Sequence, residues 1–100
     1  MFKENKVFNK EVKLYRKKID KIDNKIVKFL NKRGQLVNLL GEIKNKYKVD
    51  IYQPEREEEI IERMKIKSKV LRNTSIESIW KEIIKGCKFL QAVDIPEKKY

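Results

Sequence analysis

The sequence predicts an all-α fold with three helices per chain: one long, one short and one of medium length. Apolar residues recur every three or four positions along most of the chain, which is the spacing of amphipathic helices. The 100 residues include only three glycines and two prolines, and no stretch of useful length alternates apolar and polar residues as a strand does. We therefore expect one helical domain, or half of a symmetric one.

The long helix is expected at about residues 10–47, a stretch without proline. At ~1.5 Å per residue it would be ~55 Å long, whereas a compact chain of this size has a radius of gyration of only ~13 Å. One chain cannot cover such a helix, so we expect a partner helix from an identical chain. The expected contact stripe consists of Ile19, Ile22, Ile26, Phe29, Arg33, Leu36, Leu40, Ile43 and Tyr47.

Two shorter helices are expected after the long one. Pro54 suits the first position of a helix at about residues 54–69. The negatively charged glutamates that follow it would stabilise the N-terminus of this helix, which carries the positive end of the helix dipole. Thr74 and Glu77 have the spacing of a capping box, which predicts a third helix at about residues 75–93. Its inner stripe would comprise Ile76, Ile79, Trp80, Ile83, Cys87 and Leu90.

The composition excludes several kinds of chemistry. The chain has no histidine, and its lone cysteine, Cys87, cannot form an internal disulfide or a zinc cluster. No apolar run approaches the ~20 residues of a membrane span, and the N-terminal segment lacks the apolar core of a secretory signal. We expect a cytoplasmic protein that uses no metal or cofactor and no membrane partner.

The formal net charge of +11 would suit a nucleic-acid-binding protein. The lysines, however, occur in every segment and are mixed with 15 acidic residues, as on solvated helix faces. A basic nucleic-acid binder would also place its cations on outer faces rather than inside an apolar stripe. We therefore expect no nucleic-acid partner, but a positive field that attracts small anions.

Arg33 interrupts the apolar stripe of the long helix and is the most informative residue of the chain. A guanidinium that is buried without a partner costs several kcal/mol. Its counter-ion is either a carboxylate of the protein, such as Glu57, or a carboxylate of a ligand. The first alternative predicts a structural ion pair and the second predicts a binding site.

Further polar residues lie on or beside the expected apolar faces. Lys44 follows Arg33 by three helical turns and points in nearly the same direction. Gln91 lies one turn after Cys87 on the third helix, and Glu57 precedes Ile61 by four residues and so faces inward. Each of these has an ordinary structural explanation when taken singly. Together, cations, an amide and a carboxylate against apolar walls are typical of a pocket for a small anion.

Four stretches of the chain, in this order, resemble the small, stand-alone type of the all-helical class of chorismate mutases. They are RKKIDKIDNKIVKFLNKR at 16–33, GEIKNK at 41–46, IYQPEREEEIIERM at 51–64 and IWKEIIKGCKFLQ at 79–91. The resemblance implies one such domain over residues 1–100 and an intertwined homodimer with two active sites. It also implies that each site receives Arg16 from the partner chain. This agrees with helix geometry, because Arg16 and Arg33 are ~25 Å apart along one helix.

The resemblance implies roles for the cations and the amide. Arg16 of the partner chain and Arg33 would bind the two carboxylates of chorismate. Lys44 would bridge a carboxylate and the ether oxygen, and Gln91 would donate a hydrogen bond to that oxygen. Lys44, Gln91 and Arg33 would therefore be the catalytic residues.

The remaining site residues are implied in the same way. Glu57 would accept a hydrogen bond from the ring hydroxyl, and Arg56 would help to orient Glu57. Gln53 stands where the family commonly has an aspartate, and its backbone would lie near the ring hydroxyl. Cys87 stands where a serine is common near a substrate carboxylate, and a thiol is a weaker donor than a hydroxyl.

The implied reaction is the pericyclic rearrangement of chorismate to prephenate, in the biosynthesis of phenylalanine and tyrosine. It requires no nucleophile, metal or redox cofactor, which agrees with a chain without histidine. One alternative is an isochorismate pyruvate-lyase on the same fold. The other is a non-catalytic regulatory or docking partner of another aromatic-pathway enzyme.

Overall fold

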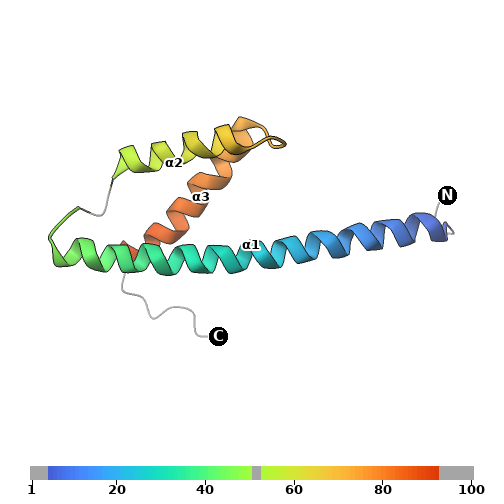
Figure 1. Cartoon of the computed structure of the whole chain (residues 1–100), viewed down its shortest axis with the longest axis horizontal. Coiled ribbons are helices and arrows are strands. Elements are labelled where there is room, and N and C mark those ends of the chain that lie inside the picture. Colours follow the sequence, from blue (N-terminus) through green and yellow to red (C-terminus); the bar gives the residue numbers. More distant parts are fainter. Residues whose placement is uncertain (1–4, 51–52, 93–100) are drawn as a thin grey trace. The chain divides into compact units, whose positions relative to one another are not determined.

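The computed structural model describes residues 5–50 and 53–92, and of residues 89–92 only the backbone. These residues form three helices: α1 (Lys6–Lys46), α2 (Pro54–Lys67) and α3 (Asn73–Ala92) (Figure 1). The described ranges contain no strand. The predicted all-α fold, with a long, a short and a medium helix, is confirmed.

The long helix begins earlier than expected because Asn5 caps it. The Asn5 side-chain oxygen accepts a hydrogen bond from the backbone N–H of Phe8 at 2.9 Å, which is the contact of an N-cap residue. At the other end Lys48 has a φ of 59°. The Val49 N–H donates to the Lys44 carbonyl at 2.8 Å, so the chain leaves α1 through a left-handed residue, as in many helix C-termini.

The connection between α2 and α3 is short. Pro54 occupies the first turn of α2 as expected, and the helix ends where Ser68 takes an extended conformation. The Ser68 hydroxyl donates to the Leu71 carbonyl at 3.2 Å. Thr74 lies inside the first turn of α3, which begins at Asn73. The expected capping box is therefore wrong, because Thr74 is not the residue before the helix.

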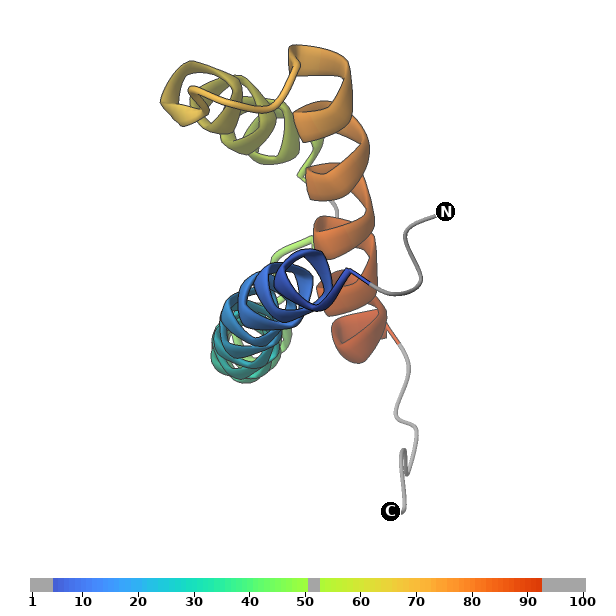
Figure 2. The ribbon, with the colours of Figure 1, turned by 90° about the vertical axis from the view of Figure 1, so that its right-hand side faces the viewer.

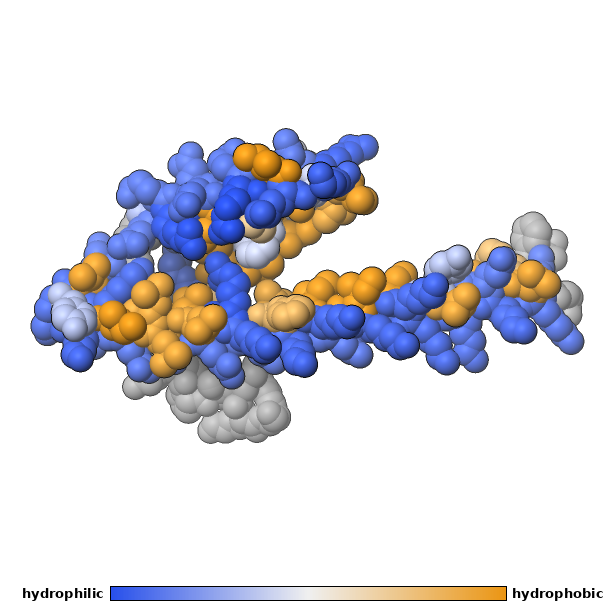
Figure 3. Space-filling model, in the orientation of Figure 1, coloured by the Kyte–Doolittle hydropathy of each residue, from blue (hydrophilic) through white to orange (hydrophobic). Residues whose placement is uncertain are grey.

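Contacts between Cα atoms divide the chain into two compact units, residues 1–32 and residues 33–100, and α1 contributes to both. Of the first unit the structure describes residues 5–32, and in this range no element other than α1 is present to cover its apolar side chains. Exposed fractions are 57% for Ile22, 49% for Ile26 and 61% for Phe29. Apolar atoms are visible along the surface of this helix in Figure 3.

In the second unit α2 packs against α3, next to the turn that joins them (Figure 1, Figure 2). The small core of this unit consists of Ile60 from α2 and Ile76, Ile84 and Cys87 from α3. Ile76 and Cys87 belong to the predicted inner stripe of α3, whereas Ile84 does not, and Ile79 of that stripe is 44% exposed.

The segment of α1 in this second unit buries a different face from the expected stripe. Gly34 and Gly41 are buried, whereas Leu36 and Ile43 remain 66% and 54% exposed. The buried face is therefore offset from the apolar stripe by about one residue, or ~100° around the helix. The stripe itself stays open within a single chain.

Charged side chains join the end of α2 to the start of α3. Lys65 lies 2.9 Å from Glu77 and 3.0 Å from Glu62, and Lys81 lies 2.9 Å from the other oxygen of Glu77. Hydrogen bonds from Lys65 and then Lys81 lower the pKa of Glu77 to about 2. The Glu77 and Glu62 carboxylates raise the pKa of Lys65 above its ordinary value.

A search of the helices within the described residues finds none with the length and hydropathy needed to cross a bilayer.

Candidate active site

Arg33 lies at the start of the second unit, and its side chain reaches α3. Its guanidinium carbon is 5.7 Å from the centroid of the Trp80 ring, a cation–π geometry. Both residues are half-buried. Within residues 5–50 and 53–92, no carboxylate forms an ion pair with Arg33. The alternative of a structural Arg33–Glu57 pair is therefore wrong for this chain.

Lys44 is half-buried on the same segment of α1. It follows Arg33 by eleven residues, which is ~16 Å along the helix axis and nearly the same direction around it. Two long cationic side chains at this spacing can lean toward one small ligand. The binding of one anion by both Arg33 and Lys44 stays a prediction.

Glu57 faces α3, as its position one turn before Ile61 predicted. Its Oε2 atom lies 2.8 Å from Nζ of Lys88, and the two side chains are 29% and 34% exposed. Arg56 points elsewhere: its guanidinium donates to Glu59 at 2.9 Å, and both side chains are more than half exposed. The cation that contacts Glu57 is therefore Lys88. Arg56, which the family resemblance implied would orient Glu57, pairs with Glu59 instead.

The remaining expected residues of this unit occupy different environments. Gln53 is exposed, precedes α2 and makes no side-chain capping hydrogen bond. Cys87 is a buried, free thiol in the core of α3. Gln91 belongs to the last turn of α3, and its side chain lies outside the described residues. Helical spacing places it one turn beyond Cys87 and Lys88.

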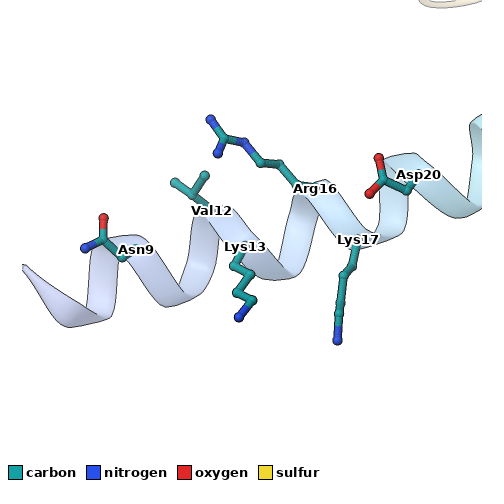
Figure 4. Close-up of a pocket in the computed structure, with 6 residues that line it drawn as sticks. All are labelled: Asn9, Val12, Lys13, Arg16, Lys17 and Asp20. Atoms are coloured by element: carbon teal, nitrogen blue, oxygen red, sulfur yellow. The ribbon is translucent and has the colours of Figure 1, made fainter.

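Arg16 belongs to the first unit and is exposed. Figure 4 shows its side chain on the same side of α1 as Val12 and Asn9, with Lys13 and Lys17 pointing the other way. A concavity along one helix has only one wall, so these residues do not form a pocket by themselves. A ligand at Arg16 would need a second surface opposite the helix.

Sequence reasoning missed Lys88 as a site residue. Lys88 follows Ile84 by four residues and Trp80 by eight, which is the spacing of the inner stripe of α3. A signal was therefore present, in the same form that identified Arg33: a cation at an inner position of an amphipathic helix.

The chemistry of the second unit favours an anionic ligand. Its half-buried cations include Arg33 and Lys44 on α1 and Lys88 on α3, and Lys88 binds the Glu57 carboxylate. Lys65 is half-buried as well, but it is paired with Glu62 and Glu77. The aromatic ring of Trp80 lies beside the Arg33 guanidinium. Guanidinium and ammonium donors beside apolar surfaces can bind carboxylates and orient an apolar ring.

Comparisons with known proteins agree with this chemistry. No curated protein sequence matches the chain. A solved structure of chorismate mutase (form II) from Thermus thermophilus is similar, with a TM-score of 0.81 and 26% identity over 84% of this chain and 97% of the other. Form I from the same organism gives a TM-score of 0.75 and 27% identity over 77% and 98% of the two chains. Residues 15–92 match the sequence profile of chorismate mutase type II, so the chain belongs to the chorismate mutase type II family.

Proposed function

We propose that this chain is a chorismate mutase, which converts chorismate to prephenate by a concerted rearrangement within one molecule. The observation that carries the proposal is the environment of Arg33. This cation is half-buried against Trp80, and no carboxylate of the described residues neutralises it. A ligand with carboxylates, such as chorismate, supplies the missing counter-ion.

Binding of the substrate uses the cations. Arginine grips a carboxylate through two parallel hydrogen bonds, which fixes orientation as well as charge. Arg33 would bind one carboxylate of chorismate, and Arg16 of a second copy would bind the other. Glu57 would accept a hydrogen bond from the ring hydroxyl. Held at these points, the flexible enolpyruvyl arm lies over the ring, which is a proximity effect.

Catalysis beyond proximity requires donors at the ether oxygen. As the carbon–oxygen bond breaks, negative charge grows on that oxygen. Lys44 and Gln91 would donate to it, and donors fixed before the reaction stabilise the transition state more than the substrate. No covalent intermediate forms, so the chain needs no nucleophile and no general base.

Three further residues would surround the substrate without being catalytic. Cys87 would lie near a carboxylate, Arg56 would add positive potential at the entrance, and the backbone of Gln53 would lie near the ring hydroxyl. The exposure of Arg56 and Gln53 supports a place at the rim for both side chains.

The site would be completed by a homodimer. The apolar stripe of α1 remains open in one chain: the exposed fraction is 54% for Ile19, 57% for Ile22, 66% for Leu36 and 47% for Leu40. Contiguous apolar surface of this kind is rare on a soluble monomer. Burying it against the same stripe of a second copy would also supply the surface that Arg16 lacks.

The experiment is a reaction of the purified full chain with chorismate, in which loss of the substrate absorbance is followed and the product is identified. We expect prephenate. Release of pyruvate from chorismate or isochorismate would instead indicate the lyase. Activity that appears only after another aromatic-pathway enzyme is added would indicate a docking role.

A further inference from the structure

Among the described residues, the ion pair between Lys88 and Glu57 is one of two that join α2 to α3, and the other, between Lys65 and Glu77, connects the end of α2 to the start of α3. The Lys88–Glu57 pair joins residues 31 positions apart, and it is part-buried. The pairs of Arg56 with Glu59, Lys65 with Glu62, and Lys81 with Glu77 are local, three or four residues apart. The Lys88–Glu57 contact therefore fixes the relation of two helices at the candidate site.

Lys88 is also directed differently from its neighbouring lysines. Lys81 and Lys85 are exposed, whereas Lys88 is half-buried and shares the inner face of α3 with Trp80 and Cys87. A lysine that serves only solubility would lie on the outer face. The Lys88 ammonium instead lies 2.8 Å from the Glu57 carboxylate, whose orientation matters for the candidate site.

The two long-range carboxylates of this unit are used in different ways. Glu77 has both oxygens engaged, Oε1 with Lys65 and Oε2 with Lys81. Glu57 engages only Oε2, with Lys88. Within the described part of the chain no donor meets Oε1 of Glu57. Glu77 is saturated by the protein, whereas Glu57 retains one oxygen that can accept a hydrogen bond from a ligand.

We propose that Lys88 is a positioning residue that holds the Glu57 carboxylate by one oxygen so that the other accepts a hydrogen bond from the ring hydroxyl of the substrate. The inference rests on the proposed function. A glutamate side chain that is free to rotate must be ordered when the substrate binds, which costs free energy. The Lys88 contact orders the Glu57 side chain before the substrate binds, so Oε1 of Glu57 is already oriented to accept a hydrogen bond from the ring hydroxyl.

The test compares Lys88→Met with Lys88→Arg and with a matched control, Lys85→Met, on the same helix. With chorismate we expect kcat/KM to fall about tenfold in Lys88→Met, to be largely restored in Lys88→Arg and to be unchanged in Lys85→Met. Thermal unfolding followed by circular dichroism shows whether each variant keeps its helices.

A second substrate separates positioning from a merely structural role. With a chorismate analogue whose ring hydroxyl is replaced by hydrogen, Lys88→Met and the wild-type chain should react at similar rates. In a Glu57→Gln background, Lys88→Met should add little further loss, because both changes remove the same interaction.

The outcomes distinguish this inference from the proposed function. An equal loss with both substrates, or additive losses in the double variant, would show a structural role and overturn the inference. So would an unchanged Lys88→Met variant in a chain that rearranges chorismate. A wild-type chain that does not rearrange chorismate would overturn both.

Discussion

The guanidinium carbon of Arg33 lies 5.7 Å from the centroid of the Trp80 ring, and this contact joins α1 to α3 in the second unit. A tryptophan face attracts a cation through its quadrupole but does not neutralise it. Arg33 is thereby held against Trp80, and no carboxylate in the described ranges 5–50 and 53–92 occupies its N–H donors. This arrangement explains how a charged residue is tolerated beside an apolar stripe before any ligand binds.

Because Trp80 is the single tryptophan of the chain, its fluorescence should report on Arg33. Binding of a dicarboxylate such as prephenate should draw the guanidinium toward the ligand and change the Trp80 emission. We expect a saturable change in the wild-type chain and none in Arg33→Ala, measured by fluorescence titration at constant ionic strength. Lys85→Met serves as the control for an exposed cation. An equal response from Arg33→Ala would place the ligand elsewhere.

Removal of the cations that bind the substrate should affect rate far more than folding. We expect Arg33→Ala and Lys44→Ala each to lower kcat/KM by about 10²–10³, as when one preorganised donor is lost. Far-ultraviolet circular dichroism and size-exclusion chromatography should show a helical dimer for both. Unfolding of either variant would indicate that the cation serves the structure, and that the interpretation of Arg33 as a ligand-binding residue is wrong.

The helices were predictable from sequence because their signals are local. The three-to-four periodicity and Pro54 gave the correct order and type of the elements. The start of α1 was missed because Asn5 caps it without a glutamate or glutamine three residues later. The capping box predicted at Thr74 was wrong because α3 begins at Asn73, so that Thr74 lies inside the helix. The Glu77 carboxylate instead binds Lys65 of α2 and Lys81 one turn later on α3.

The candidate site was less accessible to sequence reasoning. Arg33 stood out because it replaces an apolar residue, and its lack of an acidic partner could be seen only in three dimensions. The position of Glu57 on the inner face of α2 was predicted correctly, but the cation that orients it was predicted to be Arg56 and is Lys88. Arg56 is adjacent in sequence, whereas Lys88 is distant in sequence and adjacent in space.

Substitution of Cys87 by serine should separate substrate binding from stability. The thiol is buried at 8% exposure, and a hydroxyl buried without a partner costs ~1–3 kcal/mol. We expect Cys87→Ser to unfold at a lower temperature, while the stronger donor lowers the KM for chorismate if the side chain faces a substrate carboxylate. Calorimetry and steady-state kinetics measure the two effects. A raised or unchanged KM would show that Cys87 contributes only to the core.

The stability of the chain should depend on pH through Glu77. Its pKa is lowered from 4.5 to about 2 by Lys65 and Lys81, so the folded state binds the proton less well than the unfolded state. Glu77 therefore stabilises the fold above pH 4.5, and this contribution disappears as the pH falls to about 2. Conversely, Lys65, whose pKa is raised from 10.5, stabilises the fold below that pH and less so above it.

Thermal unfolding of wild-type and Glu77→Gln chains between pH 2 and 7 measures this dependence. Glu77→Gln should unfold at a lower temperature near neutral pH, and the two unfolding temperatures should converge toward pH 2. Added salt should reduce the difference, because these groups are accessible to solvent. Glu59→Gln is the matched control, since Glu59 is exposed and pairs only with Arg56. A difference in unfolding temperature between the two chains that stays constant down to pH 2 would contradict the stabilising role of the Glu77 carboxylate.

Mixing of two inactive chains tests whether two copies share each site. If a site uses Arg33 of one chain and Arg16 of its partner, a heterodimer of Arg16→Ala and Arg33→Ala chains contains one intact site and one site that lacks both arginines. After refolding at equal concentrations, random pairing makes about half of the dimers heterodimers, so about a quarter of the wild-type activity should return. A chain with both substitutions provides the control: refolded with wild-type chain, it should form only inactive heterodimers and lower the activity about twofold below that of the wild-type chains present. Heterodimers that form, as shown by native mass spectrometry, but restore no activity would assign Arg16 and Arg33 to separate tasks rather than to one shared site.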